Sequence, residues 1–463
     1  MYHVTWTAVT NQGEQKAVAL ATLAHGSGRP WSIFEVEVVD TGPVPSEPSG
    51  VAIVPPDAFT DRMEWESPLP HAALRRTLGA DVARRTRESE GMKGIAIRPG
   101  VAWSIHLRDV PEPTLNEIPG GRGVLVRVLR AGLCGTDAEI AAGLFGNAPP
   151  GEEAMVLGHE HLGQVVAVGS AVHEPGLQPG CLVVASNRRP GRSLWDGIGL
   201  QDYTADLDTL ERGVRGLHGF LVEQYVDDAR FLTPVPDALL DVGVLTEPMS
   251  VVEKGLSQAW TIQRRLGVWR PARALVVGAG TIGLLTTLAL RLRGLDVTCI
   301  ARSQAPTANS VLVEATGARY VSTRERGIAT IAAQDGLFDL VLEASGAADL
   351  IPPSAMALAP NGVLVLASVT GGSTVVPVDL AAWNQAFVLW NRAMVGTVNS
   401  APVDWLNGVG TLAQARTVLP GWTERLLTTR IEGLDPDAIS RHLKDPGRSI
   451  KTVVHIAEPA PAA

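Results

Sequence analysis

The stretch VVGAGTIGLL, residues 276–285, decides the fold class of this 463-residue chain. Gly278, Gly280 and Gly283 stand in G-x-G-x-x-G spacing, directly after an apolar run and at the start of a helix-length segment. A tight turn, a close approach of the backbone to a pyrophosphate and close helix–strand packing each require a residue without a Cβ atom. The N-terminus of the following helix also favours an anion. The stretch therefore predicts a dinucleotide-binding turn.

Four apolar segments around this turn alternate with segments long enough for helices. They are ARALVVGAG (272–280), LDVTCIA (295–301), FDLVLEASG (338–346) and GVLVLASV (362–369). Such β-rich runs, alternating with helices, are typical of a doubly wound parallel sheet that is buried on both faces. We therefore expect an α/β fold for this part of the chain.

Two further parts precede this region. From Met92 to about residue 245, short strand-like segments alternate with Gly/Pro turns, which predicts a β-rich domain. Residues 1–91 combine two strand-like runs, KAVALATLA and SIFEVEVVD, with a Pro-rich stretch and a charged run, HAALRRTLGADVARRTRESEG, that is typical of a helix. We expect residues 1–91 to be an appended segment of unknown function; a true start at Met92 is the alternative.

The composition excludes several classes of function. A net charge of −9, without a Lys/Arg run, argues against nucleic acid as a partner. No apolar stretch approaches the roughly 20 residues of a membrane-spanning helix, and the start does not resemble a secretory leader. Cys134, Cys181 and Cys299 are odd in number and far apart, which indicates a reducing compartment and a cytoplasmic location. Cys181 and Cys299 lie in apolar runs and are expected to be buried hydrophobic residues.

The choice of dinucleotide depends on the end of the strand after the glycine turn. In enzymes that use NAD, an acidic residue there binds the ribose 2′-hydroxyl. Here the strand DVTCIA is followed by Arg302 and Ser303, and Arg302 can pair with a 2′-phosphate. We therefore expect NADP to be preferred, with NAD as the alternative.

Residues of three zinc-ligand types precede the glycine turn. Cys134 stands in GLCGTD, His159 and Glu160 in GHE, and Glu247 in LTEP. Thiolate, imidazole and carboxylate bind zinc, and three protein ligands with an open position define a catalytic rather than a structural site. Cys134 and His159 are too far apart in the sequence for a zinc finger.

The motifs GLCGTDAEI, GHE, VGAGTIG and LEASG resemble those of zinc-dependent medium-chain dehydrogenases. SNRRPG, ERGVRGLHGFLVEQYVDD, LTEPMSVVEK and MVGTVNSAPVDW resemble more narrowly the glucose 1-dehydrogenase branch of that family. The resemblance extends from about Met92 to the end of the chain and leaves residues 1–91 unexplained. It implies a GroES-like catalytic domain over 92–254, completed by 400–463, and a Rossmann domain over 255–399.

The resemblance also implies roles for individual residues. One catalytic zinc ion would be bound by Cys134, His159 and Glu160, with Glu247 as a further ligand, directly or through water. Thr136 would relay a proton from the substrate. The residues implied to contact the cofactor are Gly278, Gly280, Thr281, Ile282, Gly283, Arg302, Ser303, Ser345 and Asn399; those implied to contact substrate are Thr136, Asn187, Glu211 and Glu247. Alternatively, Asn187 is a turn residue, Glu211 a carboxylate at a helix start and Asn399 a cap.

The sequence departs from the family pattern after RRPG. Many relatives carry four cysteines that bind a structural zinc in this lobe, whereas residues 188–210 contain none. A structural zinc is therefore excluded, and we expect packing by Trp195 and Tyr203 to hold the lobe. His161 and His218 are not expected to bind zinc: His161 would support a ligand or lie on the surface, and His218 would be a turn residue.

The implied activity is transfer of a hydride from an aldose C1 hydroxyl to NAD(P), which yields a lactone. One alternative is the same chemistry on a secondary alcohol of a specialised polyol, amino-sugar or cyclitol. A second alternative, of another class, is a regulatory protein that binds a nucleotide without catalysis. A small-molecule substrate and a homodimer or homotetramer are expected in the first two cases.

Overall fold

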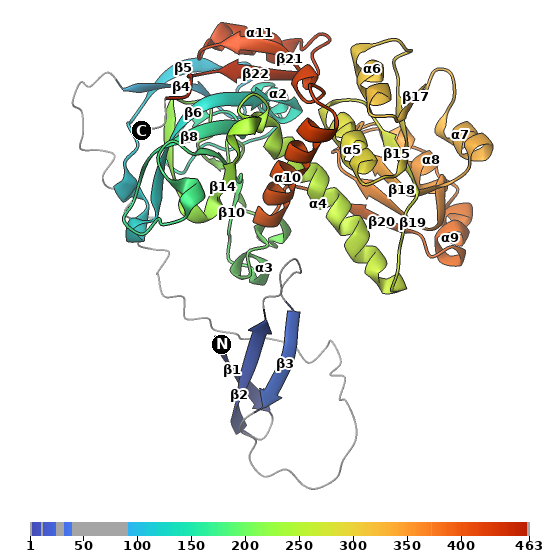
Figure 1. Cartoon of the computed structure of the whole chain (residues 1–463), viewed down its shortest axis with the longest axis horizontal. Helices are drawn as coiled ribbons and strands as arrows, with labels where there is room; N and C mark the ends of the chain where they lie inside the picture. Colours follow the sequence, from blue (N-terminus) through green and yellow to red (C-terminus); the bar gives the residue numbers. More distant parts are fainter. Residues whose placement is uncertain (1, 11–12, 25–31, 39–90, 372, 461–463) are drawn as a thin grey trace. The chain divides into compact units, whose positions relative to one another are not determined.

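The computed structural model describes residues 2–10, 13–24, 32–38, 91–371 and 373–460 (Figure 1). The chain divides into two compact units, Met1–Leu78 and Gly79–Ala463, and each is described by itself. In the first unit, β1 (Tyr2–Thr10), β2 (Gly13–Ala24) and β3 (Ser32–Val38) form an antiparallel sheet in that order. The two predicted strands in this segment are β2 and β3; the predicted helical run falls almost wholly outside the described residues.

The β-rich part of the second unit is built around β6 (Gly123–Leu133), whose residues are nearly all buried. The main sheet has the order β14-β9-β8-β6-β22-β21, and β13 also pairs with β6. The other strands are β8 (Glu160–Val168), β9 (Leu182–Ala185), β13 (Gln224–Asp228), β14 (Leu232–Val235), β21 (Leu427–Glu432) and β22 (Lys451–His455). The last strand of the chain is therefore a direct neighbour of the central strand.

Two small sheets and the α-helices α2, α3 and α11 also belong to this part of the described chain. The sheets are β5-β4-β7 and β10-β11-β12. Their strands are β4 (Met92–Ile97), β5 (His106–Val110), β7 (Met155–Val156), β10 (Arg188–Arg189), β11 (Leu210–Arg212) and β12 (Gly216–Leu217); the helices are α2 (Gly135–Ala141), α3 (Leu194–Gly197) and α11 (Pro436–Lys444).

A six-stranded parallel sheet of order β17-β16-β15-β18-β19-β20 forms the second part, which confirms the predicted doubly wound fold. Its strands are β15 (Arg273–Val277), β16 (Asp296–Ala301), β17 (Arg319–Ser322), β18 (Phe338–Glu343), β19 (Leu358–Leu366) and β20 (Ala393–Gly396). Its helices are α5 (Thr281–Leu292), α6 (Ala308–Ala315), α7 (Ile328–Asp335), α8 (Ile351–Met356) and α9 (Leu380–Leu389). The strand order reverses at β15, where ligands bind in such sheets.

Two long helices, α4 (Thr246–Gln263) and α10 (Pro402–Val418), pack against each other between the two sheets (Figure 1). One hydrophobic core runs from Leu129 and Leu162 through these helices to α5 and the parallel sheet. The predicted boundary between residues 254 and 255 falls inside α4, so this helix belongs to both parts. No helix in the described part of the chain is long and apolar enough to span a membrane.

Candidate active site

The pairing of β6 with β8 brings the two metal-binding motifs together. Gly132 pairs with Glu160, so Cys134, just after β6, lies beside His159, just before β8. Cys134 Sγ is 3.1 Å from His159 Nε2. Two ligands of one tetrahedral zinc ion lie about 3.5 Å apart, so this approach is close to that of a shared metal. Burial raises the pKa of the Cys134 thiol, and the neighbouring His159 only partly opposes this increase.

Asp137 contacts the other nitrogen of the same imidazole. Its Oδ1 lies 3.4 Å from His159 Nδ1, and its Oδ2 accepts a hydrogen bond of 2.9 Å from the backbone N–H of Cys134. Burial lowers the pKa of His159, but the charges of Cys134 and Asp137 outweigh it and hold that pKa well above its ordinary value. A carboxylate on the far nitrogen is the usual support of a metal-binding histidine. Sequence reasoning missed Asp137, although an acidic residue three positions after a helix cap was visible.

Glu160 is paired with a lysine that sequence reasoning also missed. Lys451, the first residue of β22, forms a buried ion pair with Glu160. Burial opposes the charge of the lysine, yet the charge of Glu160 raises the pKa of Lys451. Gly132 makes room for this pair, because a Cβ there would collide with the Glu160 carboxylate.

Glu247 completes the cluster from the first turn of α4. One ligand atom each from His159, Glu160 and Glu247 lies within 4.8 Å of the others. Asn187, the second residue of the SNRRPG motif, donates a 2.9 Å hydrogen bond to Glu247 Oε1. Burial and the charge of Glu160 raise the pKa of Glu247 to about 7. A second group, Cys134, Asp137 and His159, shares His159 with this one, and the thiol, imidazole and carboxylates of the two groups are donors that suit zinc.

Thr136 and Glu211 are the other residues predicted to contact substrate, and Asn399 is predicted to contact the cofactor. Each of the three has its own surroundings. Thr136 is half-buried on α2, two residues after Cys134. Glu211 is engaged by Arg188, whose Nε donates a 2.7 Å hydrogen bond to its carboxylate. Glu211 lies in a short strand, β11, so the alternative of a helix start is wrong. Asn399 has a positive φ of 57° in the loop after β20.

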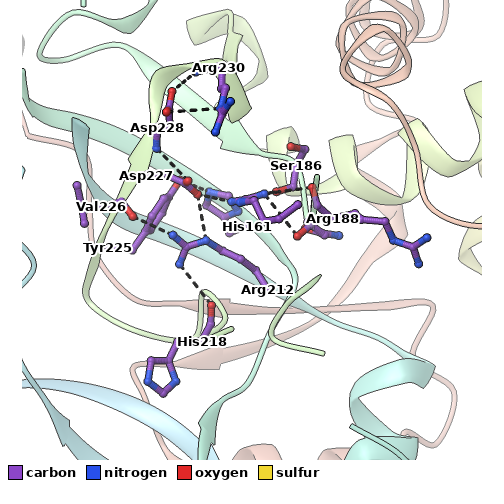
Figure 2. A network of polar contacts seen from close by, with 12 residues as sticks. His161, Ser186, Arg188, Arg212, His218, Tyr225, Val226, Asp227, Asp228 and Arg230 are labelled. Atoms are coloured by element: carbon purple, nitrogen blue, oxygen red, sulfur yellow. Dashed lines mark hydrogen bonds and ion pairs between the residues drawn. The ribbon is translucent and has the colours of Figure 1, made fainter. Parts of the chain in front are cut away.

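His161 is not on the surface. Figure 2 shows it within a polar network beside Tyr225, whose hydroxyl lies 2.7 Å from His161 Nε2. Burial, followed by the charges of Arg212 and Arg189, lowers the pKa of His161 well below its ordinary value. His218 contacts Val156 N–H and Glu152 instead of the metal-binding cluster. Neither histidine is among the residues of the two potential metal-binding groups.

The same network fixes the backbone beside Asn187. Asp227 forms ion pairs with both Arg189 and Arg212. Figure 2 shows the pair with Arg212, in which the two atoms lie 3.0 Å apart. Arg212 also donates its backbone N–H to Asn187 O, at 3.0 Å, and Arg189 donates to Ser186 O. The side chain that reaches Glu247 thus extends from a backbone held on both sides.

The glycine turn has the geometry that its spacing predicts. Gly278 has a φ of +106°, and a Cβ on Gly283 would collide with the carbonyl of Gly278. A Cβ on Gly280 would meet no atom of the described chain within 4 Å. Space is therefore left at the N-terminus of α5, where a pyrophosphate binds in this type of turn.

The remaining predicted cofactor residues lie around this edge of the parallel sheet. Thr281 and Ile282 begin α5, and Ser345, after β18, donates its backbone N–H to Glu343 Oε1 at 2.6 Å. Arg302 and Ser303 are exposed after β16, and Ser303 O accepts a 2.6 Å hydrogen bond from Tyr320. A short path connects the turn with the metal-binding cluster. Thr281 Oγ1 donates a 2.7 Å hydrogen bond to Ile450 O, and the next residue, Lys451, pairs with Glu160.

Hydrogen bonds hold the cysteine-free lobe. Asp196 Oδ2 accepts from both Ser193 Oγ and Thr204 Oγ1, each at 2.6 Å. Tyr203 packs under Lys254 as part of the lobe's attachment, whereas Trp195 is 44% exposed, so the prediction of a role for Trp195 receives no support. Cys299 is buried as expected, but Cys181 is only partly buried.

Comparison with known proteins gives the family. Residues 240–456 match the family described as glucose dehydrogenase C-terminus, and residues 120–237 match the alcohol dehydrogenase GroES-like domain. The glucose 1-dehydrogenase of Methanocella arvoryzae is 38% identical over 367 residues, which cover 79% of this chain and 99% of that protein. That of Thermoproteus tenax is 39% identical over 338 residues, 73% of this chain and 92% of that protein.

Comparison with solved structures leads to the same family. The glucose dehydrogenase of Haloferax mediterranei, in complex with NADP, Zn and gluconolactone, has a TM-score of 0.70 and 31% identity, and the match covers 79% of this chain and all (100%) of that one. These findings confirm the expected fold and resemblance. The chain belongs to the zinc-dependent medium-chain dehydrogenase family, in its glucose 1-dehydrogenase branch, and is a glucose 1-dehydrogenase-like oxidoreductase.

Proposed function

We propose that the protein oxidises the C1 hydroxyl of glucose or a similar aldose to a lactone, with NADP preferred over NAD and one catalytic zinc ion. A single observation carries the proposal. Residues 450 and 451 link the glycine turn, through Thr281, to the metal-binding cluster, through Glu160. Hydride transfer requires the nicotinamide to lie next to the metal-held hydroxyl, so the cofactor site and the metal site must be adjacent. The Haloferax mediterranei relative, with NADP, Zn and gluconolactone, supports the same pairing.

When bound, zinc would act as a Lewis acid toward the sugar hydroxyl, and the nicotinamide would accept the hydride. Cys134, His159 and Glu160 would hold the metal ion, with Glu247 as a further ligand. Asp137 would keep His159 in the tautomer whose Nε2 is free to bind metal. Thr136 would carry the hydroxyl proton outward.

Substrate and cofactor contacts extend from the same elements. Asn187 and Glu211 would bind sugar hydroxyls, with Asn187 also orienting Glu247. Asn399 would contact the nicotinamide end, and Arg302 and Ser303 the 2′-phosphate. The rest of the proposed cofactor site is Gly278, Gly280, Thr281, Ile282, Gly283 and Ser345.

We also propose a homodimer or homotetramer. Support comes from β20, which lies at one edge of the parallel sheet, and from neighbouring exposed apolar side chains. Leu380 on α9 is 72% exposed, Leu389 71% and the adjoining Trp390 50%. Unpaired edges and apolar patches favour association with another copy.

The test follows the absorbance of the reduced nicotinamide, NADPH from NADP or NADH from NAD, as zinc-loaded enzyme meets a panel of aldoses, polyols and cyclitols. Turnover of an aldose that is lost in Cys134→Ala supports the proposal. Turnover of only a polyol or cyclitol replaces the substrate class. Absence of bound zinc from the purified, zinc-treated protein contradicts the proposed chemistry.

The cofactor preference is tested separately with Arg302→Ala. We expect the Kd for NADP to rise about tenfold while that for NAD stays unchanged, because a guanidinium–phosphate pair is lost. Equal effects on both cofactors would contradict the role of Arg302.

A further inference from the structure

One face of α4 contacts three segments that are remote in the sequence. Glu247, Ser250, Lys254 and Gln258 follow each other at intervals of three and four residues, so their side chains lie on one side of the helix. Glu247 accepts from Asn187 at 2.9 Å, Ser250 Oγ is 2.8 Å from Ser400 Oγ, and Gln258 donates to Tyr203 OH at 2.8 Å.

Lys254 is the charged residue at the centre of this face. Its side chain is 4% exposed, and its Nζ lies 2.5 Å from Asp202 Oδ2, whose side chain is 1% exposed. The ammonium also donates to Val398 O at 2.8 Å and lies 4.3 Å from the centre of the Tyr203 ring. Its donors thus face a carboxylate, a carbonyl and an aromatic ring.

Packing alone does not explain a buried ion pair at this position. Removing two charges from water is expensive, and apolar side chains of similar volume often stabilise a fold as well or better. The role of Lys254 is therefore better explained by the two segments whose positions it fixes. A carbonyl and a carboxylate from separate segments are held at one point by directional bonds, which apolar contacts do not provide.

The two segments are those that border the proposed substrate and nicotinamide positions. Val398 immediately precedes Asn399, whose φ is +57°. Asp202 and Tyr203 belong to the cysteine-free lobe, which begins directly after Asn187. Lys254 is two helical turns from Glu247, so α4 sets the spacing of all three segments from the metal-binding cluster.

We propose that Lys254 is a positioning residue for hydride transfer. It holds the loop that contains Asn399 and the cysteine-free lobe at fixed positions relative to Glu247. The proposal rests on the proposed function, in which Asn399 contacts the nicotinamide end. Lys254 itself touches neither zinc nor substrate in this scheme. Its loss changes the placement of the nicotinamide and leaves the metal-binding residues intact.

Two variants of the full-length chain separate positioning from folding. Lys254→Met removes the contact to Val398 O but leaves Asp202 buried without its partner. The double variant Lys254→Met/Asp202→Asn removes both charges and so avoids that penalty. Glu253→Gln is the matched control, since Glu253 is the adjacent α4 residue and pairs in a different direction, with Arg293 Nη2 at 2.6 Å and Thr411 Oγ1 at 2.7 Å.

The measurements are zinc content, NADPH titration followed by the fluorescence of the bound nicotinamide, and kcat and KM on the best aldose. For both Lys254 variants we expect wild-type zinc content, altered nicotinamide fluorescence, weaker NADPH binding and a kcat lowered at least about tenfold. The Glu253→Gln control should stay within about twofold of the wild type in these properties.

A folded double variant with wild-type kcat, NADPH affinity and nicotinamide fluorescence overturns the proposal, whatever its thermal stability. If Lys254→Met alone does not fold, the double variant decides. If the wild type oxidises no aldose, the proposed function fails, and the NADPH fluorescence of the variants still decides the role of Lys254.

Discussion

At the scale of single residues, His159 has a different partner at each ring nitrogen. Nε2 faces the Cys134 thiol at 3.1 Å and Nδ1 faces Asp137 at 3.4 Å. Because a carboxylate at Nδ1 orients the ring and increases the basicity of the other nitrogen, Asp137 should strengthen metal binding without itself being a ligand.

We therefore expect Asp137→Asn to lower the zinc affinity by about 10–100-fold. Competition with a chromophoric chelator measures the change. Glu139→Gln is the matched control, because Glu139 is an exposed carboxylate on the same helix, α2. Equal zinc affinity in the two variants would show that Asp137 does not support His159.

Asp404, in the first turn of α10, gives a prediction about pH. It is buried, it accepts a 2.9 Å hydrogen bond from Ala401 N–H, and burial raises its pKa to about 6. The folded state therefore binds this proton more tightly than the unfolded state. The resulting stability is fully present below about pH 4 and is lost as the pH rises toward 6.

Asp404→Asn lacks this titration. Between pH 4 and pH 7, its free energy of unfolding should rise by about 3 kcal/mol relative to that of the wild type, because the pKa of Asp404 is about 6 in the folded state and about 4 in the unfolded chain. Urea unfolding at several pH values tests this. A constant difference between the two proteins would mean that Asp404 titrates normally.

At the scale of elements, the parallel sheet and its glycine turn could be predicted because their signals are local. The spacing of Gly278, Gly280 and Gly283 reports the turn directly, and apolar runs report buried strands. Lys451 and Lys254 could not be predicted. Their partners depend on the pairing of β22 with β6 and on the packing of the lobe against α4, which no short window of sequence contains.

Two glycines of the turn, Gly280 and Gly283, are expected to respond differently to substitution by alanine. Gly280→Ala should fold normally, because its Cβ meets no described atom within 4 Å, but should weaken NADP binding at least about tenfold by occupying the space for the pyrophosphate. Gly283→Ala should instead lower the melting temperature, because its Cβ collides with Gly278 O. Thermal melts and NADPH titrations of both variants separate the two effects. Normal NADP binding by Gly280→Ala would contradict the proposed phosphate position.

At the scale of the whole molecule, α9 carries exposed apolar side chains and directly precedes β20, an edge strand of the parallel sheet. We expect the wild type to elute at a dimer or tetramer mass, and Leu380→Glu/Leu389→Glu to shift it toward the monomer, because buried carboxylates disfavour an interface. Light scattering after size exclusion measures the mass. Val268→Glu, at a position that is 70% exposed in the loop before β15, is the control. An unchanged mass in the α9 variant would place the interface elsewhere.

The pairing of β22 with β6 also sets the order of events during synthesis. Because synthesis runs from the N-terminus, β6 and β8 emerge from the ribosome long before residues 451–455. Until then, one edge of the central strand is unpaired and Glu160 has no lysine beside it. Until residues 451–455 have emerged, the catalytic domain is therefore incomplete, and the open edge of β6 is available to competing strands.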